Sequence, residues 1–299
     1  PPRTVLLAAG AAVVALGAGA LVPVVRSALA APDFTAALPD LAPLPLRAGP
    51  DGVLRGDLVA APAGAGLRYN GGTPLLKLKE GDRVRLAFRN DLDAPSSLHL
   101  HGLPLPPAVD APLDHLEPGG TSVQEFTVPE GTAGTYWYHP HAHGDVERQL
   151  LAGLAGPIVV AGPADHADWD DRLLMFTRVG RDIAVNGAVR PVFTPNRGLT
   201  RLRLLNATAG DHLLLGAVRA GARLPLHLIA TDGGLVDRPV ELTEVLLAPG
   251  ERGEVLVDTS AAGRFTLTAL PYSVYGAGGA TSAEVGLVAA DVPAGLAAV

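Results

Sequence analysis

The sequence predicts an all-β protein made of two similar sandwich units. Over residues 83–89, apolar side chains alternate with arginines, which is the period-2 pattern of a half-buried strand. The chain contains 36 glycines and 27 prolines, so turns are frequent, as expected for many short strands. Beyond residue 31, no long window shows a helical period. With 299 residues, the chain is long enough for two domains of about 100–150 residues each.

A weak internal repeat supports the two units. Matching segments follow in the same order in each half of the chain: 80–90, 98–102, 117–119 and 134–136, then 200–206, 229–233, 248–250 and 263–265. The spacing is the same in both halves, because Gly102 lies 16 positions before Pro118 and Gly233 lies 16 positions before Pro249. We therefore expect one unit over 66–162, a second over 163–290, and a tail or linker over 291–299.

The first 31 residues have the pattern of an export signal. Arg3 precedes an apolar stretch from Val5 to Val25, and small residues follow over 27–31. The apolar stretch is also long enough to be an uncleaved membrane anchor. In either case we expect the remainder to be exported to the periplasm, cell envelope or extracellular space. Residues 32–65 are rich in Ala, Pro and Gly, and we expect an extended N-terminal arm over the first unit.

The composition excludes several classes of function. The formal net charge is −7, and no basic run interleaved with aromatic residues occurs, so nucleic acid is not an expected partner. The sequence contains no cysteine, which excludes a disulfide, a zinc ribbon, a cysteine nucleophile and a copper–thiolate centre within it. The single methionine rules out a methionine-rich copper site in this sequence.

Two short phrases contain four histidines that predict a metal site. His99 and His101 are two apart in one strand-like phrase, and His139 and His141 are two apart in another. Side chains at this spacing on a strand point to the same face, so each phrase offers a pair of imidazoles. If the two strands are neighbours, the four rings form a site suited to copper, zinc, iron or nickel.

The repeat places this site in the first unit only. When Gly102 is matched to Gly233, the histidines of the first phrase align with Ala230 and Asp232. When residue 134 is matched to residue 263, the histidines of the second phrase align with a threonine and a leucine. His143 continues the second phrase, and we expect it beside the site rather than in it. The other histidines are expected to be unpaired surface or core residues: His115, His166, His212 and His227.

The remaining residues near these motifs have structural interpretations. Trp137 is expected to pack beside the histidines without direct chemistry. The arginines of the two matching strands are expected to line solvated strand faces: Arg83, Arg85 and Arg89 in the first unit, and Arg201 and Arg203 in the second.

The histidine phrases resemble the copper-site signatures of the multicopper oxidase family, of the laccase and bacterial copper-efflux-oxidase type. The first phrase, His99-Leu100-His101-Gly102, matches H-x-H-G, and the second is Trp137-Tyr138-His139-Pro140-His141. The second half resembles the middle domain of the family through Asn186-Gly187, Asp232-Gly233-Gly234 and Ala248-Pro249-Gly250-Glu251-Arg252. The resemblance covers about residues 66–290, as the first two domains of the family.

The resemblance implies that each unit is a cupredoxin domain, a Greek-key β-sandwich. By position, it implies that His99 ligates a type 2 copper, and that His101, His139 and His141 ligate a type 3 copper pair. Together they would form half of a trinuclear site that reduces dioxygen to water. Asp110 stands where the family keeps a carboxylate that helps to deliver protons, which makes it the candidate catalytic residue. A turn-forming role for Asp110 before Pro112 is the alternative.

The sequence departs from the family in one large respect. Multicopper oxidases complete the cluster with further histidine motifs, one of them a His-Cys-His that ligates the type 1 copper, and nothing here matches. We therefore expect a truncated or split oxidase, inactive as an isolated chain. It would need a missing cupredoxin domain or partner subunit, together with dioxygen and a reducing substrate. The alternative is a non-enzymatic exported copper-binding or envelope scaffold protein.

Overall fold

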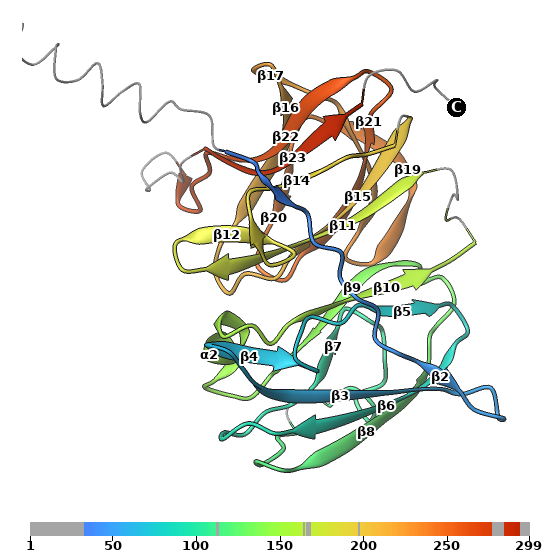
Figure 1. The fold of residues 1–299 in the computed structure, drawn as a ribbon. Coiled ribbons are helices and arrows are strands. Elements are labelled where there is room, and N and C mark those ends of the chain that lie inside the picture. The colour runs from blue at the N-terminus through green and yellow to red at the C-terminus, as the bar shows by residue number, and fades with distance from the viewer. Residues whose placement is uncertain are drawn as a thin grey trace, which may run out of the picture. The chain divides into compact units, whose positions relative to one another are not determined.

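The computed structural model of the chain describes residues 33–111, 114–163, 165, 169–196, 198–276 and 284–293. The predicted export segment over 1–31 lies outside these residues, and so does most of the predicted tail. Within the described ranges, no helix combines the length and the apolar character needed to cross a membrane. The prediction of an all-β fold is confirmed, because the described residues form strands and one short helix, α2 (Val146–Leu151) (Figure 1).

The first sandwich consists of two sheets around one hydrophobic core. One sheet has the order β2-β3-β6-β8, with β4 paired to β3: β2 (Arg47–Ala48), β3 (Leu54–Ala63), β4 (Gly66–Tyr69), β6 (Arg83–Asn90) and β8 (Thr121–Thr127). The other has the order β5-β10-β9-β7: β5 (Leu76–Lys79), β7 (His99–His101), β9 (Gly134–His139) and β10 (Gly156–Ala161). On β5 the leucines are buried and the lysines exposed, so period-2 alternation turns one face to the core. Phe88, Tyr69 and Tyr138 pack edge-to-face within this core.

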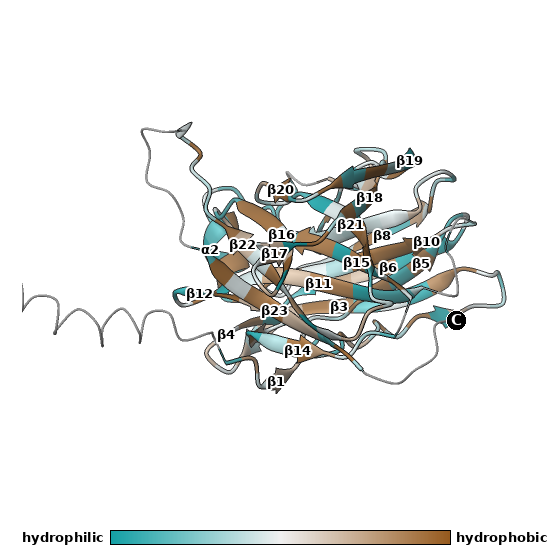
Figure 2. Ribbon diagram, turned by 90° about the horizontal axis from the view of Figure 1, so that it is seen from above, coloured by the Kyte–Doolittle hydropathy of each residue, from teal (hydrophilic) through white to brown (hydrophobic). Residues whose placement is uncertain are grey.

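The second sandwich is built in the same way. One sheet has the order β13-β12-β11-β15-β21-β18-β19: β11 (Asp170–Val179), β12 (Asp182–Val185), β13 (Ala188–Val189), β15 (Leu199–Asn206), β18 (Leu226–Thr231), β19 (Gly234–Leu242) and β21 (Arg252–Asp258). The other has the order β1-β14-β23-β22-β16-β17, with β20 paired to β16: β1 (Ala36–Ala37), β14 (Pro191–Phe193), β16 (Leu213–Arg219), β17 (Ala222–Arg223), β20 (Val245–Leu247), β22 (Gly263–Leu270) and β23 (Val285–Val292). Hydrophobic residues dominate β16 and β23 (Figure 2), and both strands contribute to a separate core.

The two sandwiches share the same main strand pairings. These pairings match the first histidine phrase to a different strand from the one that the sequence repeat predicts. β3 and β6 are parallel and β6 pairs antiparallel with β8, as β11, β15 and β21 do in the second sandwich. β7 pairs with β9 as β16 pairs with β22. The counterpart of β7 is therefore β16, and the predicted match of its histidines to Ala230 and Asp232 is wrong. Those residues belong to a hairpin, β18–β19, that joins the other sheet.

The predicted arm over 32–65 contains both extended chain and a regular strand. It begins against the second sandwich rather than the first, because β1 pairs in parallel with β14 and Phe34 lies against Gly286. The chain then reaches the first sandwich through the bridge between Pro43 and Leu75. From Leu54 onward it is β3, which pairs along its length with β6 and carries the fully buried Leu58.

Arg201 and Arg203 are buried, which corrects the prediction that they line a solvated face. Their side chains lie under the first sandwich and share Glu254, which is only 1% exposed. Arg201 Nε donates to Glu254 at 2.8 Å, and Arg203 Nη1 donates to the same carboxylate at 3.0 Å. The hydroxyl of Thr135, on β9, donates to Glu254 at 2.6 Å. Buried charges need such partners, so this cluster ties β9 to the second sandwich.

Candidate metal centre

Pairing of β7 with β9 brings the two histidine phrases together. The two strands are antiparallel neighbours, and the register sets His99 opposite His139 and His101 opposite Trp137. Directly opposed residues share a face of the sheet, and residues two apart on one strand do as well. His99, His101 and His139 therefore point to one side, as the spacing of the phrases predicts.

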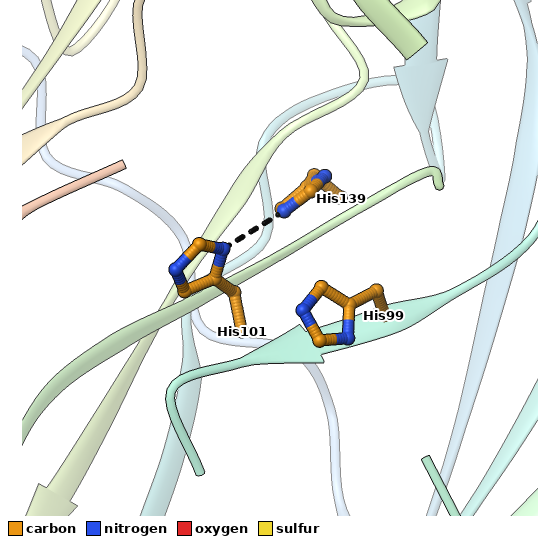
Figure 3. A group of neighbouring side chains, drawn as sticks. All are labelled: His99, His101 and His139. Atoms are coloured by element: carbon orange, nitrogen blue, oxygen red, sulfur yellow. Dashed lines mark hydrogen bonds between the residues drawn. The ribbon is translucent and has the colours of Figure 1, made fainter. Parts of the chain in front are cut away.

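These three imidazoles converge closely enough to hold a metal ion. One ring nitrogen from each of His99, His101 and His139 lies within 4.8 Å of the others. Nδ1 of His101 is 3.1 Å from Nε2 of His139, and the three ring centroids are 5.2–5.4 Å apart (Figure 3). Nitrogen atoms this close, on rings without a permanent charge, form a donor set that transition metals bind.

His141 lies beside this group rather than within it. Its ring centroid is 5.6 Å from that of His99 and 6.4 Å from that of His139. The backbone N–H of His141 donates to Ser97 Oγ at 2.8 Å, which fixes the chain just after β9. Nδ1 of His141 is buried and has no hydrogen-bond partner among the described residues. A bound cation would satisfy this nitrogen, so His141 fits a metal site that is larger than one three-nitrogen group.

An oxygen atom lies close to Nδ1 of His139 and another lies close to Nδ1 of His99, which leaves Nε2 of each ring for a metal. Nδ1 of His139 is 2.8 Å from the carbonyl oxygen of Pro140, which can only accept, so Nδ1 carries the proton and Nε2 carries the lone pair. Nδ1 of His99 is 2.8 Å from a carboxylate oxygen of Asp110, a close contact that does not have the geometry of a hydrogen bond. The other oxygen of Asp110 accepts a hydrogen bond of 3.1 Å from the backbone of Leu100. Such partners of metal-bound histidines set the tautomer and hold the ring.

Burial keeps the central rings neutral. It lowers the pKa of His139 to about 3, although the hydrogen bond to Pro140 acts in the opposite direction. Burial also lowers the pKa of His101 to about 4, and the nearby positive charge of Arg252 adds to this effect. A neutral imidazole has a free lone pair, so both rings are ready to bind a cation at neutral pH.

Trp137 and the second sandwich form the walls of the centre. The Trp137 ring is 2% exposed and stacks on His139 with centroids 4.1 Å apart, which confirms the packing role predicted for it. Gly250 and Arg252 approach from the second sandwich, against His101 and Gly102. The sequence alone does not indicate these two residues as part of the centre. The sequence contains two indirect signals: residues 248–250 match 117–119 in the repeat, and the phrase Ala248–Arg252 resembles the middle domain of the family.

The other histidines that the structure describes fall into two groups. His115 is not unpaired as predicted, because its Nε2 accepts a hydrogen bond of 3.2 Å from the backbone N–H of His143. Both residues are exposed, and the ring of His143 is 5.7 Å from that of His141, so they lie at the edge of the centre. His212 stacks on Tyr272 and His227 lies on β18, in the second sandwich. His166 lies outside the described residues.

Known proteins with similar sequences include multicopper oxidases and a cell division protein. A family profile described as Multicopper oxidase matches residues 62–165. Multicopper oxidase mco of Staphylococcus aureus is 32% identical over 65% of this chain and 48% of its own length. Cell division protein FtsP of Escherichia coli is 31% identical over 67% of this chain and 47% of its own length. This chain therefore spans about half the length of the curated relatives that it matches.

Solved structures extend the similarity to both sandwiches. A multicopper oxidase from Campylobacter jejuni, described as a metallo-oxidase, has a TM-score of 0.78 and 26% identity. The similarity covers 87% of this chain and 62% of that one. A laccase-like multicopper oxidase from Ochrobactrum sp. has a TM-score of 0.74 and 27% identity, covering 87% of this chain and 64% of that one.

Proposed function

Because the chain belongs to the multicopper oxidase family, we propose that its histidine cluster is one half of an oxygen-reducing copper site. His99 would hold a type 2 copper, and His101, His139 and His141 would hold their share of a type 3 pair. Copper bound there supplies one-electron redox chemistry for the reduction of dioxygen to water. The observation that supports the proposal is the convergence of nitrogens from His99, His101 and His139 within 4.8 Å.

Asp110 is the residue of this chain that we assign to proton handling. Its carboxylate lies 2.8 Å from Nδ1 of His99, and the residue is 9% exposed. It can therefore keep the proton on Nδ1, which leaves Nε2 of His99 for the metal. A carboxylate at the edge of the buried centre can also exchange protons with solvent. Both roles depend on the contact between this carboxylate and the ring of His99.

The electron-entry site of such an oxidase is outside this sequence. A type 1 copper takes a cysteine thiolate, and the 299 residues include no cysteine. The remaining ligands would come from a further cupredoxin domain or a partner subunit. We propose that the domain over 66–162 binds copper, that the domain over 163–290 has no metal site of its own, and that turnover of a reducing substrate requires that complement. We also propose export, in line with the pattern of residues 1–31.

Copper stoichiometry tests the proposal directly. The double variant His139→Ala/His141→Ala should lose most of the bound copper, measured by metal analysis and electron paramagnetic resonance of the purified chain. The matched control, His212→Ala/His227→Ala, removes two histidines of the second sandwich and should leave copper uptake unchanged. Equal losses in both variants would show that the site is misplaced. The copper-loaded chain should lack intense blue colour, which requires a copper–thiolate bond.

A second candidate function follows from the similarity to cell division protein FtsP. In this case the chain would be a non-enzymatic exported copper-binding or envelope scaffold protein. Metal content separates the possibilities. A chain purified without metal that takes up no added copper fits a scaffold, and a chain that binds copper but remains inactive with every complementing domain fits a binder.

A further inference from the structure

None of the described histidines of the second sandwich belongs to the metal centre, but one turn of this sandwich forms a wall of the centre. Gly250 lies in the turn before β21, with a φ of +89°. A Cβ added there would lie 3.3 Å from Cε1 of His101 and 3.6 Å from Trp137. The backbone of this turn is therefore in close contact with the ring of His101, and a side chain at this position would crowd the ring.

Arg252 fixes that turn and one of the metal-bearing strands at the same time. The guanidinium is buried, and it donates to three backbone carbonyls: Gly250 O at 3.1 Å, Asp232 O at 2.8 Å and Thr135 O at 3.2 Å. Thr135 lies on β9, four residues before His139. The carboxylate of Asp232, 2.6 Å from Nη1, compensates the charge of the guanidinium. One side chain thus joins the turn to β9.

Arg252 also reaches the chain that leaves the other metal-bearing strand. Gly102 follows His101 directly and has a φ of +89°. A Cβ added at Gly102 would lie 2.2 Å from Nη2 of Arg252, so glycine is needed for the close approach of the two. The Arg252 side chain therefore lies against the backbone after His101 and holds the backbone before Trp137 and His139.

We propose that Arg252 is a positioning residue of the metal centre, which sets the ring of His101 relative to that of His139. This inference rests on the proposed copper site. Arginine suits the role because its planar fork donates in several fixed directions, whereas lysine presents one compact ammonium group. Residues that hold metal ligands from behind commonly change metal affinity by about 10- to 100-fold when they are replaced.

The test compares two buried arginines of the second sandwich, with Cu²⁺ alone as the probe and the full chain as the sample. Arg252→Lys should weaken copper binding by about 10- to 100-fold in a chelator competition, and should change the copper hyperfine pattern in electron paramagnetic resonance. Arg201→Lys is the matched control, since Arg201 is as deeply buried and its ion pairs within the described part of the chain are with Asp165, Asp171 and Glu254. It should lower the thermal midpoint but leave the copper affinity and spectrum as in the wild type.

Two outcomes would overturn the inference. One is a wild-type affinity and spectrum for Arg252→Lys, and the other is an equal loss of affinity in Arg201→Lys. If Arg252→Lys fails to fold, Asp232→Asn replaces it, because this side chain is 46% exposed and the change removes only the charge beside Nη1. It should weaken copper binding in the same direction by a smaller factor, and an unchanged affinity would overturn the inference. If His139→Ala/His141→Ala also leaves copper binding intact, the proposed function itself has failed.

Discussion

Two turns of the molecule have the same local structure but different surroundings. The backbone N–H of Gly119 donates to Asn90 O at 2.7 Å, and that of Gly250 donates to Asn206 O at 2.8 Å. Both glycines have positive φ, +80° and +89°. A Cβ added at Gly119 would have no atom within 4 Å, whereas one at Gly250 would meet the ring of His101. The same turn is thus a solvent-exposed connection in one sandwich and a wall of the metal centre in the other.

The strands that follow these turns differ in the same way. Thr121, two residues after Gly119, is exposed, whereas Arg252, two residues after Gly250, is buried. Two residues further on, Val123 is 45% exposed and Glu254 is 1% exposed. The ladders that the two sandwiches share, β6 with β8 and β15 with β21, do not determine this difference, although β21 also pairs with β18 whereas β8 is the edge strand of its sheet. It arises where the sheet containing β15 and β21 packs against β9, so the chemistry of a position depends on which face is covered.

The largest expected effect on stability is at the face of the β15–β21 sheet that packs against β9. Glu254→Gln should destabilise the protein by about 3–5 kcal/mol, because loss of this charge leaves Arg201 and Arg203 with incomplete compensation in a buried place. Urea unfolding measures the effect. The matched change on the first sandwich, Glu125→Gln, removes an exposed partner of Arg85 and should cost less than about 1 kcal/mol. Similar costs for the two variants would remove the distinction between the faces.

A second effect is a pH dependence that the first sandwich alone should cause. The pKa values of His101 and His139 are lowered to about 4 and about 3 in the folded chain. As pH falls below about 6.5, these rings take up protons in the unfolded chain but not in the folded one. The metal-free protein should therefore lose stability as pH decreases from 6.5 toward 4, with a limiting slope of about 1.4 kcal/mol per pH unit for each ring.

Urea unfolding at a series of pH values, with a chelator present, measures this slope. The variant His101→Gln/His139→Gln should have a shallower slope across the same range. His212→Gln/His227→Gln serves as the control in the second sandwich and should keep the slope of the wild type. A slope that is unchanged in the first variant would mean that other groups control the acid response.

The smallest difference in stability is expected between the turn at Gly119 and the turn at Gly250. Gly119→Ala and Gly250→Ala should each cost about 1–2 kcal/mol of stability, because alanine is strained at positive φ. Only Gly250→Ala should also weaken Cu²⁺ binding, since its methyl group would crowd His101. Thermal unfolding and a chelator competition on both variants check this pair. Weaker copper binding in Gly119→Ala as well would indicate a general effect of strain.

Part of the centre could be predicted from the residues alone. The H-x-H spacing on a strand places His99 and His101 on one face, because the side-chain period of a strand is two. The antiparallel pairing of β7 with β9 then adds His139 to that face. The position of Asp110 behind His99 could not be derived in this way, because the loop over 102–109 that separates β7 from Asp110 has no regular period.

The sequence by itself determined the strands, the turn glycines and the grouping of imidazoles, because each depends on neighbours a few residues apart. Only the tertiary structure decided that Arg201 and Arg203 are buried, while arginines at similar places on β6 remain at least partly exposed. It also decided that the turn at Gly250, more than 100 residues after His139, completes the wall of the centre. Alternation of polar and apolar residues shows that a strand has two different faces. It does not show whether water or another sandwich covers the polar one, since that depends on contacts between distant segments.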